Sequence, residues 1–122
     1  MADELVLIVD DNEKNLRLAR DVLAFAEFRT LTAASAGEGV SLALEHLPDV
    51  ILMDIRLPDI DGTEAAARLK AEPRTASIPI VALTSLAMKG DRERFLALGF
   101  DGYLEKPISV RELPDQVRGF CA

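Results

Sequence analysis

The sequence LVLIVDD at residues 5–11 decides the fold of this chain. Residues 5–9 form an uninterrupted apolar run rich in branched side chains, which is typical of a strand buried on both faces. Two later stretches, DVILMD at residues 49–54 and IPIVALT at residues 78–84, repeat the pattern. Each run ends on a polar side chain, so we expect central strands that deliver polar groups at one end.

Segments with helical patterns lie between these strands. Asn12 and Ser35 carry side chains that cap helix N-termini, and apolar residues recur at helical spacing after each of them. Residues 63–71 are alanine-rich, as is typical of a helix. A fourth helix is predicted over residues 89–99, and a fifth after Ser109, where the spacing of a capping box recurs.

Two weaker strands, residues 28–32 and 102–104, complete an alternation of five strands with five helices. Such alternation predicts an α/β fold: a doubly wound, five-stranded parallel sheet of order 2-1-3-4-5 with right-handed crossovers, as in flavodoxin-like folds. A chain of 122 residues is expected to form one domain, 1–122. We expect its core to include the five phenylalanines, Phe25, Phe28, Phe95, Phe100 and Phe120.

The composition excludes several classes of partner. A formal net charge of −7 disfavours nucleic acids and anionic membranes, so protein partners are expected. No apolar stretch approaches the roughly 20 residues that span a bilayer, and a cytoplasmic location is expected. The single cysteine, Cys121, precludes an internal disulfide, and we expect it to be a frayed terminal thiol.

Three acids are predicted to share one crevice. Ligands of such sheets bind beyond the carboxyl ends of the strands where the strand order reverses, and Asp10, Asp11 and Asp54 lie there. Their mutual repulsion calls for a bound cation, and Mg²⁺ suits a set of oxygen donors. We assign Asp11 and Asp54 as direct ligands, Asp10 as a ligand through water, and the backbone carbonyl of Arg56 as a further ligand.

Thr84 and Lys106 follow two other strands and should reach the same crevice. Asp54 is then the best nucleophile for attack on phosphorus, with Lys106 and the Thr84 hydroxyl holding phosphoryl oxygens. Taken singly, each residue has an ordinary structural explanation, such as an acid at a helix N-terminus. Their coincidence at four strand ends favours function. The sole histidine, His46, is expected at the far end of a helix, so no Ser-His-Asp relay is predicted.

The motif set resembles the receiver domain of bacterial two-component response regulators over essentially the whole chain. It comprises Asp10-Asp11, Asp54 within LMDIRLP at residues 52–58, Asp61-Gly62, Thr84 and Lys106-Pro107. Within the family, residues 87–91 and 106–110 resemble a stand-alone cell-cycle regulator.

The resemblance implies a signalling phosphoacceptor and not an enzyme that turns over substrates. Asp54 would take a phosphoryl group from a histidine kinase or a histidine phosphotransfer protein, and the output would pass to a downstream effector protein. Thr84 and Tyr103 would shift together and change the surface formed by the helix over residues 89–99, the strand over residues 102–104 and the helix after Ser109. It also implies a cis peptide at Lys106–Pro107, and we expect a monomer or weak homodimer.

Two residues depart from the commonest family patterns. Arg56 and Leu86 flank the path of the water that would hydrolyse the phosphoryl group. Since one is bulky and the other apolar, we predict slow self-dephosphorylation.

Three other functions remain open at this point. An FMN-binding electron carrier can share the topology, although acids after the first strand would repel the FMN phosphate. A phosphohydrolase with an aspartyl nucleophile typically has its acids separated by a spacer on the first strand, unlike Asp10 and Asp11. A receiver fragment of a longer response regulator or hybrid histidine kinase would carry the same motifs.

Overall fold

The structure is a computed structural model that describes residues 4–85 and 91–121, without the side chains of residues 91–92. Leu86, and with it the expectation for its role, lies outside the described residues. The start of the fourth helix, predicted at residue 89, also lies outside them. The strands are β1 (Leu5–Val9), β2 (Arg29–Ala33), β3 (Val50–Asp54), β4 (Ile80–Thr84) and β5 (Gly102–Glu105). The helices are α1 (Glu13–Phe25), α2 (Ala36–His46), α3 (Gly62–Ala71), α4 (Asp91–Ala97) and α5 (Leu113–Cys121).

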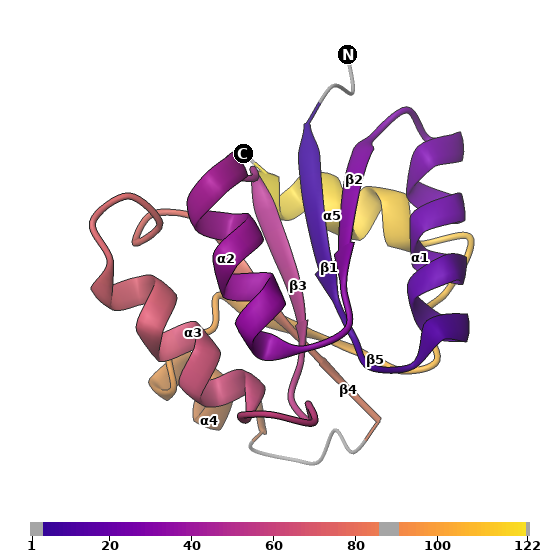
Figure 1. Cartoon of the computed structure of the whole chain (residues 1–122). Coiled ribbons are helices and arrows are strands. Elements are labelled where there is room, and N and C mark those ends of the chain that lie inside the picture. Colours follow the sequence, from indigo (N-terminus) through magenta and orange to yellow (C-terminus); the bar gives the residue numbers. More distant parts are fainter. Residues whose placement is uncertain (1–3, 86–90, 122) are drawn as a thin grey trace.

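The five strands form one parallel sheet of order β2-β1-β3-β4-β5, so the predicted fold class and strand order are confirmed (Figure 1). The register aligns Val9 with Met53 and Asp54 with Leu83. Because parallel strands end at the same edge, the residues at and just after these ends lie side by side. The weaker strand β2 lies at a sheet edge, as its composition predicts.

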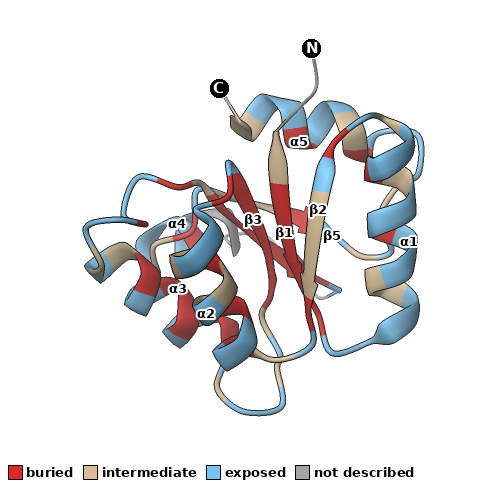
Figure 2. Cartoon of the chain, turned by 45° about the horizontal axis from the view of Figure 1, so that its top comes forward, coloured by how far each residue is buried: buried red, intermediate tan, exposed pale blue. Residues whose placement is uncertain are grey.

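Helices cover both faces of the sheet. Alternate residues of the central strands pack against α1 and α5 on one face and against α2, α3 and α4 on the other. Figure 2 shows the central strands in the colour of buried residues, with mostly exposed outer helix faces. Because the central strands are buried on both faces of the sheet, their sequences are uninterrupted apolar runs.

Two sequence expectations about burial are wrong. Phe25 is 92% exposed, because it lies two residues past the buried Leu23 and so points about 200° around α1 from it. The other phenylalanines are buried or packed against the core. Cys121 is not a frayed thiol. It is the last residue of α5, is half-buried, and packs against the core residues between the sheet and helices α1 and α5.

The last helix begins later than its capping box predicts. The Ser109 hydroxyl accepts a hydrogen bond from the Glu112 backbone N–H at 3.1 Å, as a capping residue does. The helix nevertheless begins only at Leu113, and residues 110–112 form a turn. Pro114 occupies the first helical turn, where a missing N–H is tolerated.

Candidate functional site

The carboxyl ends of the strands bring three acids together. Asp10 directly follows β1, and Asp54 is the last residue of β3. Carboxylate oxygens of Asp10, Asp11 and Asp54 lie within 4.8 Å of one another. The structure therefore places the three predicted acids in one crevice.

Asp10 is nearly inaccessible to solvent and is held by several donors. One of its oxygens accepts a hydrogen bond from the Asn12 backbone N–H at 2.9 Å, and the other accepts one from the Asn15 side-chain amide at 3.4 Å. Its own N–H donates to the Ala33 carbonyl at 3.0 Å. Asp11, in contrast, is exposed. The contact of Asn15 with this acid was not predicted from the sequence.

Lys106 bridges two of the acids. Its ammonium lies 2.8 Å from Asp10 Oδ2 and 2.9 Å from Asp54 Oδ2. The Lys106–Pro107 peptide is cis, as the resemblance implies. Burial alone would lower the pKa of Lys106, but its hydrogen bonds to Asp10 and Asp54 raise that pKa above its ordinary value. The ammonium is therefore a fixed positive charge at neutral pH.

Asp54 is a buried carboxylate under opposing influences. Burial raises its pKa, the hydrogen bonds from Lys106 and the Arg56 N–H lower it, and the nearby charge of Asp10 raises it again. The net effect is a raised pKa. Ionised Asp54 thus lacks full compensation from the protein, and an added cation would favour the charged form.

A small pocket of about 100 Å³ opens beside Asp54. Thr84, Arg56 and Arg94 line it together with Asp54, so the predicted threonine borders the same pocket as the carboxylate residue. Arg94 comes from α4 and was not singled out in the sequence, since its place depends on how α4 packs.

Tyr103 lies outside the lining of this pocket and contacts α4 instead. Its ring centroid is 5.7 Å from that of Phe95, which is a lining residue, and Tyr103 is half-buried. Phe95 thus connects the pocket to the predicted switch residue.

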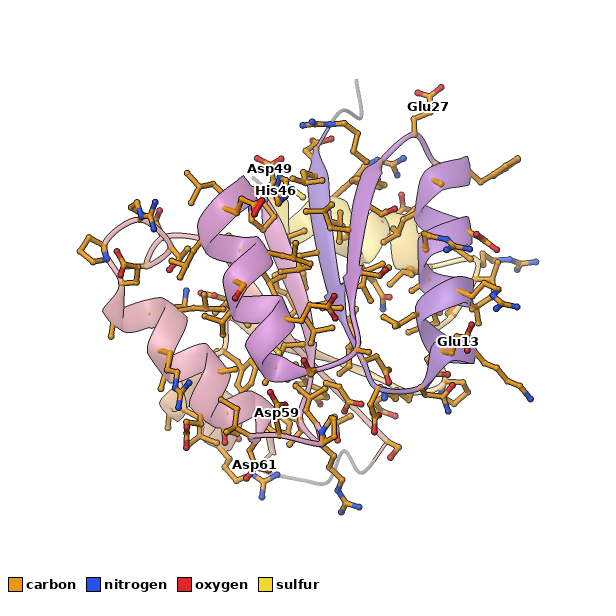
Figure 3. All side chains as sticks on the ribbon, in the orientation of Figure 1. Glu13, Glu27, His46, Asp49, Asp59 and Asp61 are labelled. Atoms are coloured by element: carbon orange, nitrogen blue, oxygen red, sulfur yellow. The ribbon has the colours of Figure 1, made fainter. Side chains whose placement is uncertain are left out.

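His46 lies far from these acids. It is the last residue of α2, and Figure 3 shows it at the opposite end of the molecule from Asp59 and Asp61. Its ring nitrogen is 3.4 Å from the exposed Glu45 carboxylate. This position fits the expectation that His46 takes no part in the crevice.

The order and spacing of the site residues match one protein family. Residues 6–118 match the sequence profile of the response regulator receiver domain. The chain belongs to this family. It is 42% identical to the polar-differentiation response regulator DivK of Brucella ovis over 115 residues, which cover 94% of each chain. The DivK of Brucella anthropi is 41% identical over the same share.

Solved receiver domains have the same architecture. The receiver domain of the sensor histidine kinase PA1611 from Pseudomonas aeruginosa, with a magnesium ion coordinated in its active-site cleft, has a TM-score of 0.89 and 34% identity. That match covers 98% of both chains. The chemotaxis protein CheY4 of Vibrio cholerae has a TM-score of 0.90 and 26% identity, with 98% of this chain and 99% of that chain covered. The resemblance predicted from the motifs is confirmed. None of the helices within the described parts of this receiver domain is long and apolar enough to cross a membrane.

Proposed function

We propose that this receiver domain is a phosphoacceptor whose Asp54 takes a phosphoryl group from a phosphohistidine of a histidine kinase or histidine phosphotransfer protein. The observation that carries the proposal is the bridging of Asp54 and Asp10 by the Lys106 ammonium, at 2.9 and 2.8 Å, at the end of the sheet. A carboxylate oxygen of Asp54 bonds to phosphorus as the phosphorus–nitrogen bond of the donor breaks. The nitrogen keeps the bonding electron pair and then takes a proton from solvent.

The acids fit a magnesium ion. Asp11 is exposed and Asp54 carries a raised pKa, so both have oxygen atoms that gain from a cation. Asp10 already accepts from Asn12, Asn15 and Lys106, one donor more than contacts Asp54, which suits contact with the metal through water. We propose Asp11, Asp54 and the Arg56 carbonyl as direct ligands. Bound Mg²⁺ would supply charge neutralisation for the phosphoryl oxygens.

Lys106 and Thr84 are the proposed holders of the other phosphoryl oxygens. Lys106 already contacts the Asp54 carboxylate that would form the acyl phosphate, so its ammonium needs little movement to pair with a phosphoryl oxygen. Thr84 lines the pocket beside Asp54 and offers a hydroxyl donor from the adjacent strand.

Thr84 and Tyr103 are the proposed switch. Phe95 lines the pocket with Thr84 and contacts the Tyr103 ring, so movement of the hydroxyl can reach the ring through α4. Tyr103 also borders a groove of about 380 Å³ between β5 and the start of α5. We propose that a downstream effector protein reads the α4-β5-α5 surface.

The proposed activity is signalling with slow self-dephosphorylation, in the cytoplasm, by a monomer or weak homodimer. Similarity to DivK over 94% of the length of that protein favours a stand-alone regulator. The alternative, a receiver within a longer regulator or hybrid kinase, is supported by the similarity to the receiver of a sensor histidine kinase.

Incubation with acetyl phosphate and Mg²⁺, followed by intact-mass measurement, tests the proposal. We expect one phosphoryl adduct in the wild type and none in Asp54→Asn. Rapid turnover of many phosphoesters without an adduct would instead favour a phosphohydrolase. Binding of FMN with no adduct would favour an electron carrier.

A further inference from the structure

The loop that joins β3 to α3, residues 55–61, is closed at its base. The Gly62 N–H donates to the Ile55 carbonyl at 2.8 Å, and the Ile55 N–H donates to the Leu83 carbonyl at 3.3 Å. Gly62 lies so close beneath the Asp54 carbonyl that a Cβ there would overlap it. The base of this loop is therefore fixed directly next to the phosphoacceptor.

The outer part of the same loop is held by Asp59. One Asp59 oxygen accepts a hydrogen bond from the Ala36 N–H at 2.9 Å, and the other accepts one from the Gly37 N–H at 2.8 Å. These two N–H groups begin α2 and have no partner within the helix, and the positive end of the helix dipole favours a carboxylate there. The two bonds lower the pKa of Asp59, so its carboxylate is ionised at neutral pH.

Arg56 lies between the fixed base and the part held by Asp59. Its N–H donates to Asp54 Oδ1 at 3.2 Å, and its carbonyl is the proposed third magnesium ligand. Leu57 and Ile60 also pack partly against the core, but such packing is non-directional. The paired bonds of Asp59 are charge-assisted and directional, so they can fix the orientation of the loop backbone.

We propose that Asp59 is a positioning residue for the metal site: by docking the 55–61 loop on the N-terminus of α2, it orients the Arg56 carbonyl. The proposal rests on the magnesium site of the proposed function. It also makes α2 part of the response to the metal, because any coupling between the metal and the docked loop must act in both directions.

Two matched controls separate the positioning of the Arg56 carbonyl from the loss of a helix cap and from the loss of a negative charge. Ser35→Ala removes another cap of the same helix, since the Ser35 hydroxyl accepts from the Glu38 N–H at 3.2 Å, but it leaves Asp59 in place. Asp61→Asn removes an equal charge from the same loop, and the Asp61 side chain makes no capping hydrogen bond. In Figure 3, Asp59 lies beside the beginning of α2, whereas Asp61 lies farther from it.

The test is titration of the unphosphorylated full chain with MgCl₂ by isothermal titration calorimetry. We expect the dissociation constant to rise on the order of tenfold in Asp59→Ala, as for other residues that orient metal ligands, and to stay near the wild-type value in both controls. Hydrogen exchange supplies a second readout. Mg²⁺ should slow exchange at the Ala36 and Gly37 amides in the wild type and in Asp61→Asn, but not in Asp59→Ala.

Wild-type affinity in Asp59→Ala, or equal weakening in Ser35→Ala, would overturn the proposal while leaving the proposed function intact. If the wild type bound no Mg²⁺ and formed no Asp54 adduct, the proposed function would fail as well. The wild-type measurements thus distinguish the two failures.

Discussion

Lys106 Nζ lies 2.9 Å from Asp54 Oδ2, although 52 positions separate the two residues in the sequence. The same ammonium contacts Asp10, whose side chain is only 2% exposed, while that of Asp54 is 9% exposed. Water screens such buried charges poorly, so the two carboxylates repel each other strongly. Lys106, which pairs with both carboxylates, offsets that repulsion.

Lys106→Met should destabilise the fold in metal-free buffer. The substitution preserves much of the stem but leaves two buried carboxylates without the ammonium between them. We expect the free energy of unfolding at pH 7 to fall by about 1–3 kcal/mol, as when one partner of a buried charged group is removed. Urea denaturation monitored by circular dichroism measures the change.

The matched control for this loss is Lys14→Met, which removes the same charge from an exposed position on α1. Its effect should be close to zero. Equal stability of the two variants would contradict a bridging role for Lys106. Added Mg²⁺ should restore part of the stability of Lys106→Met, because a ligand that binds only the folded state stabilises it.

Arg56→Asn should shorten the lifetime of the phosphoryl group. Arg56 is exposed and lines the pocket beside Asp54 and Thr84. We therefore expect its long side chain to restrict the approach of water. We expect hydrolysis to accelerate by up to about tenfold, which corresponds to roughly 1.4 kcal/mol of barrier. Intact-mass measurements over time, after removal of acetyl phosphate, give the lifetime. Arg74→Asn, which lies outside the pocket lining, is the control, and a shorter-lived wild type would refute the idea.

The sheet and the positions of the acids could be predicted from the sequence because their signals are local. An uninterrupted apolar run predicts a buried strand, and the residue at its end must then lie at the common edge of the sheet. This reasoning predicts Asp10, Asp54 and Thr84, whereas Lys106 follows the weaker strand at residues 102–104. Each one needed only the place of its own strand in the topology.

Contacts between two loops, or between a loop and a helix, carry no such signal. Asp59 bonds to residues 22 and 23 positions away, and a turn-rich loop has many polar residues that could equally face water. Arg94 lines the pocket only because of how α4 packs on the sheet. The hydrophobicity of Phe25 predicts a place in the core, but its angular position on α1 points its side chain to solvent.

Gly62→Ala should be strongly destabilising. A Cβ at Gly62 would overlap the Asp54 carbonyl, and neither backbone segment can move without disturbing the Gly62–Ile55 hydrogen bond. We expect a loss of more than about 2 kcal/mol in the free energy of unfolding, in the range of severe overpacking. Gly119→Ala on α5 is the matched comparison, since nothing beyond its chain neighbours and the backbone of its own helix lies within 4 Å of the added Cβ. That substitution should stabilise the helix by about 0.5–1 kcal/mol, and similar effects of the two would contradict the close approach.

Cys121 should react slowly with alkylating reagents. Burial raises the pKa of its thiol to about 11, with further contributions from the charges of Glu4 and Asp49. The thiolate is the reactive form, so at pH 7.5 the folded chain should react on the order of a hundredfold more slowly than an unperturbed thiol. Iodoacetamide labelling followed by mass spectrometry, with and without urea, compares the two states. Equal rates in both would mean that the end of α5 is open to solvent.

The stabilising effect of Asp59 should depend on pH in a defined direction. Its hydrogen bonds to the Ala36 and Gly37 N–H groups lower the pKa of Asp59 in the folded state, so the unfolded chain binds the proton more tightly. The stability that the ionised Asp59 contributes is therefore fully present above its unfolded pKa, about 3.9, and is lost as the pH falls through the lower folded value. Urea midpoints of the wild type and Asp59→Asn should differ at pH 6–7 and converge as the pH approaches the folded pKa. A gap for Asp59→Asn that persisted or widened in acid would contradict the docking of its carboxylate on α2.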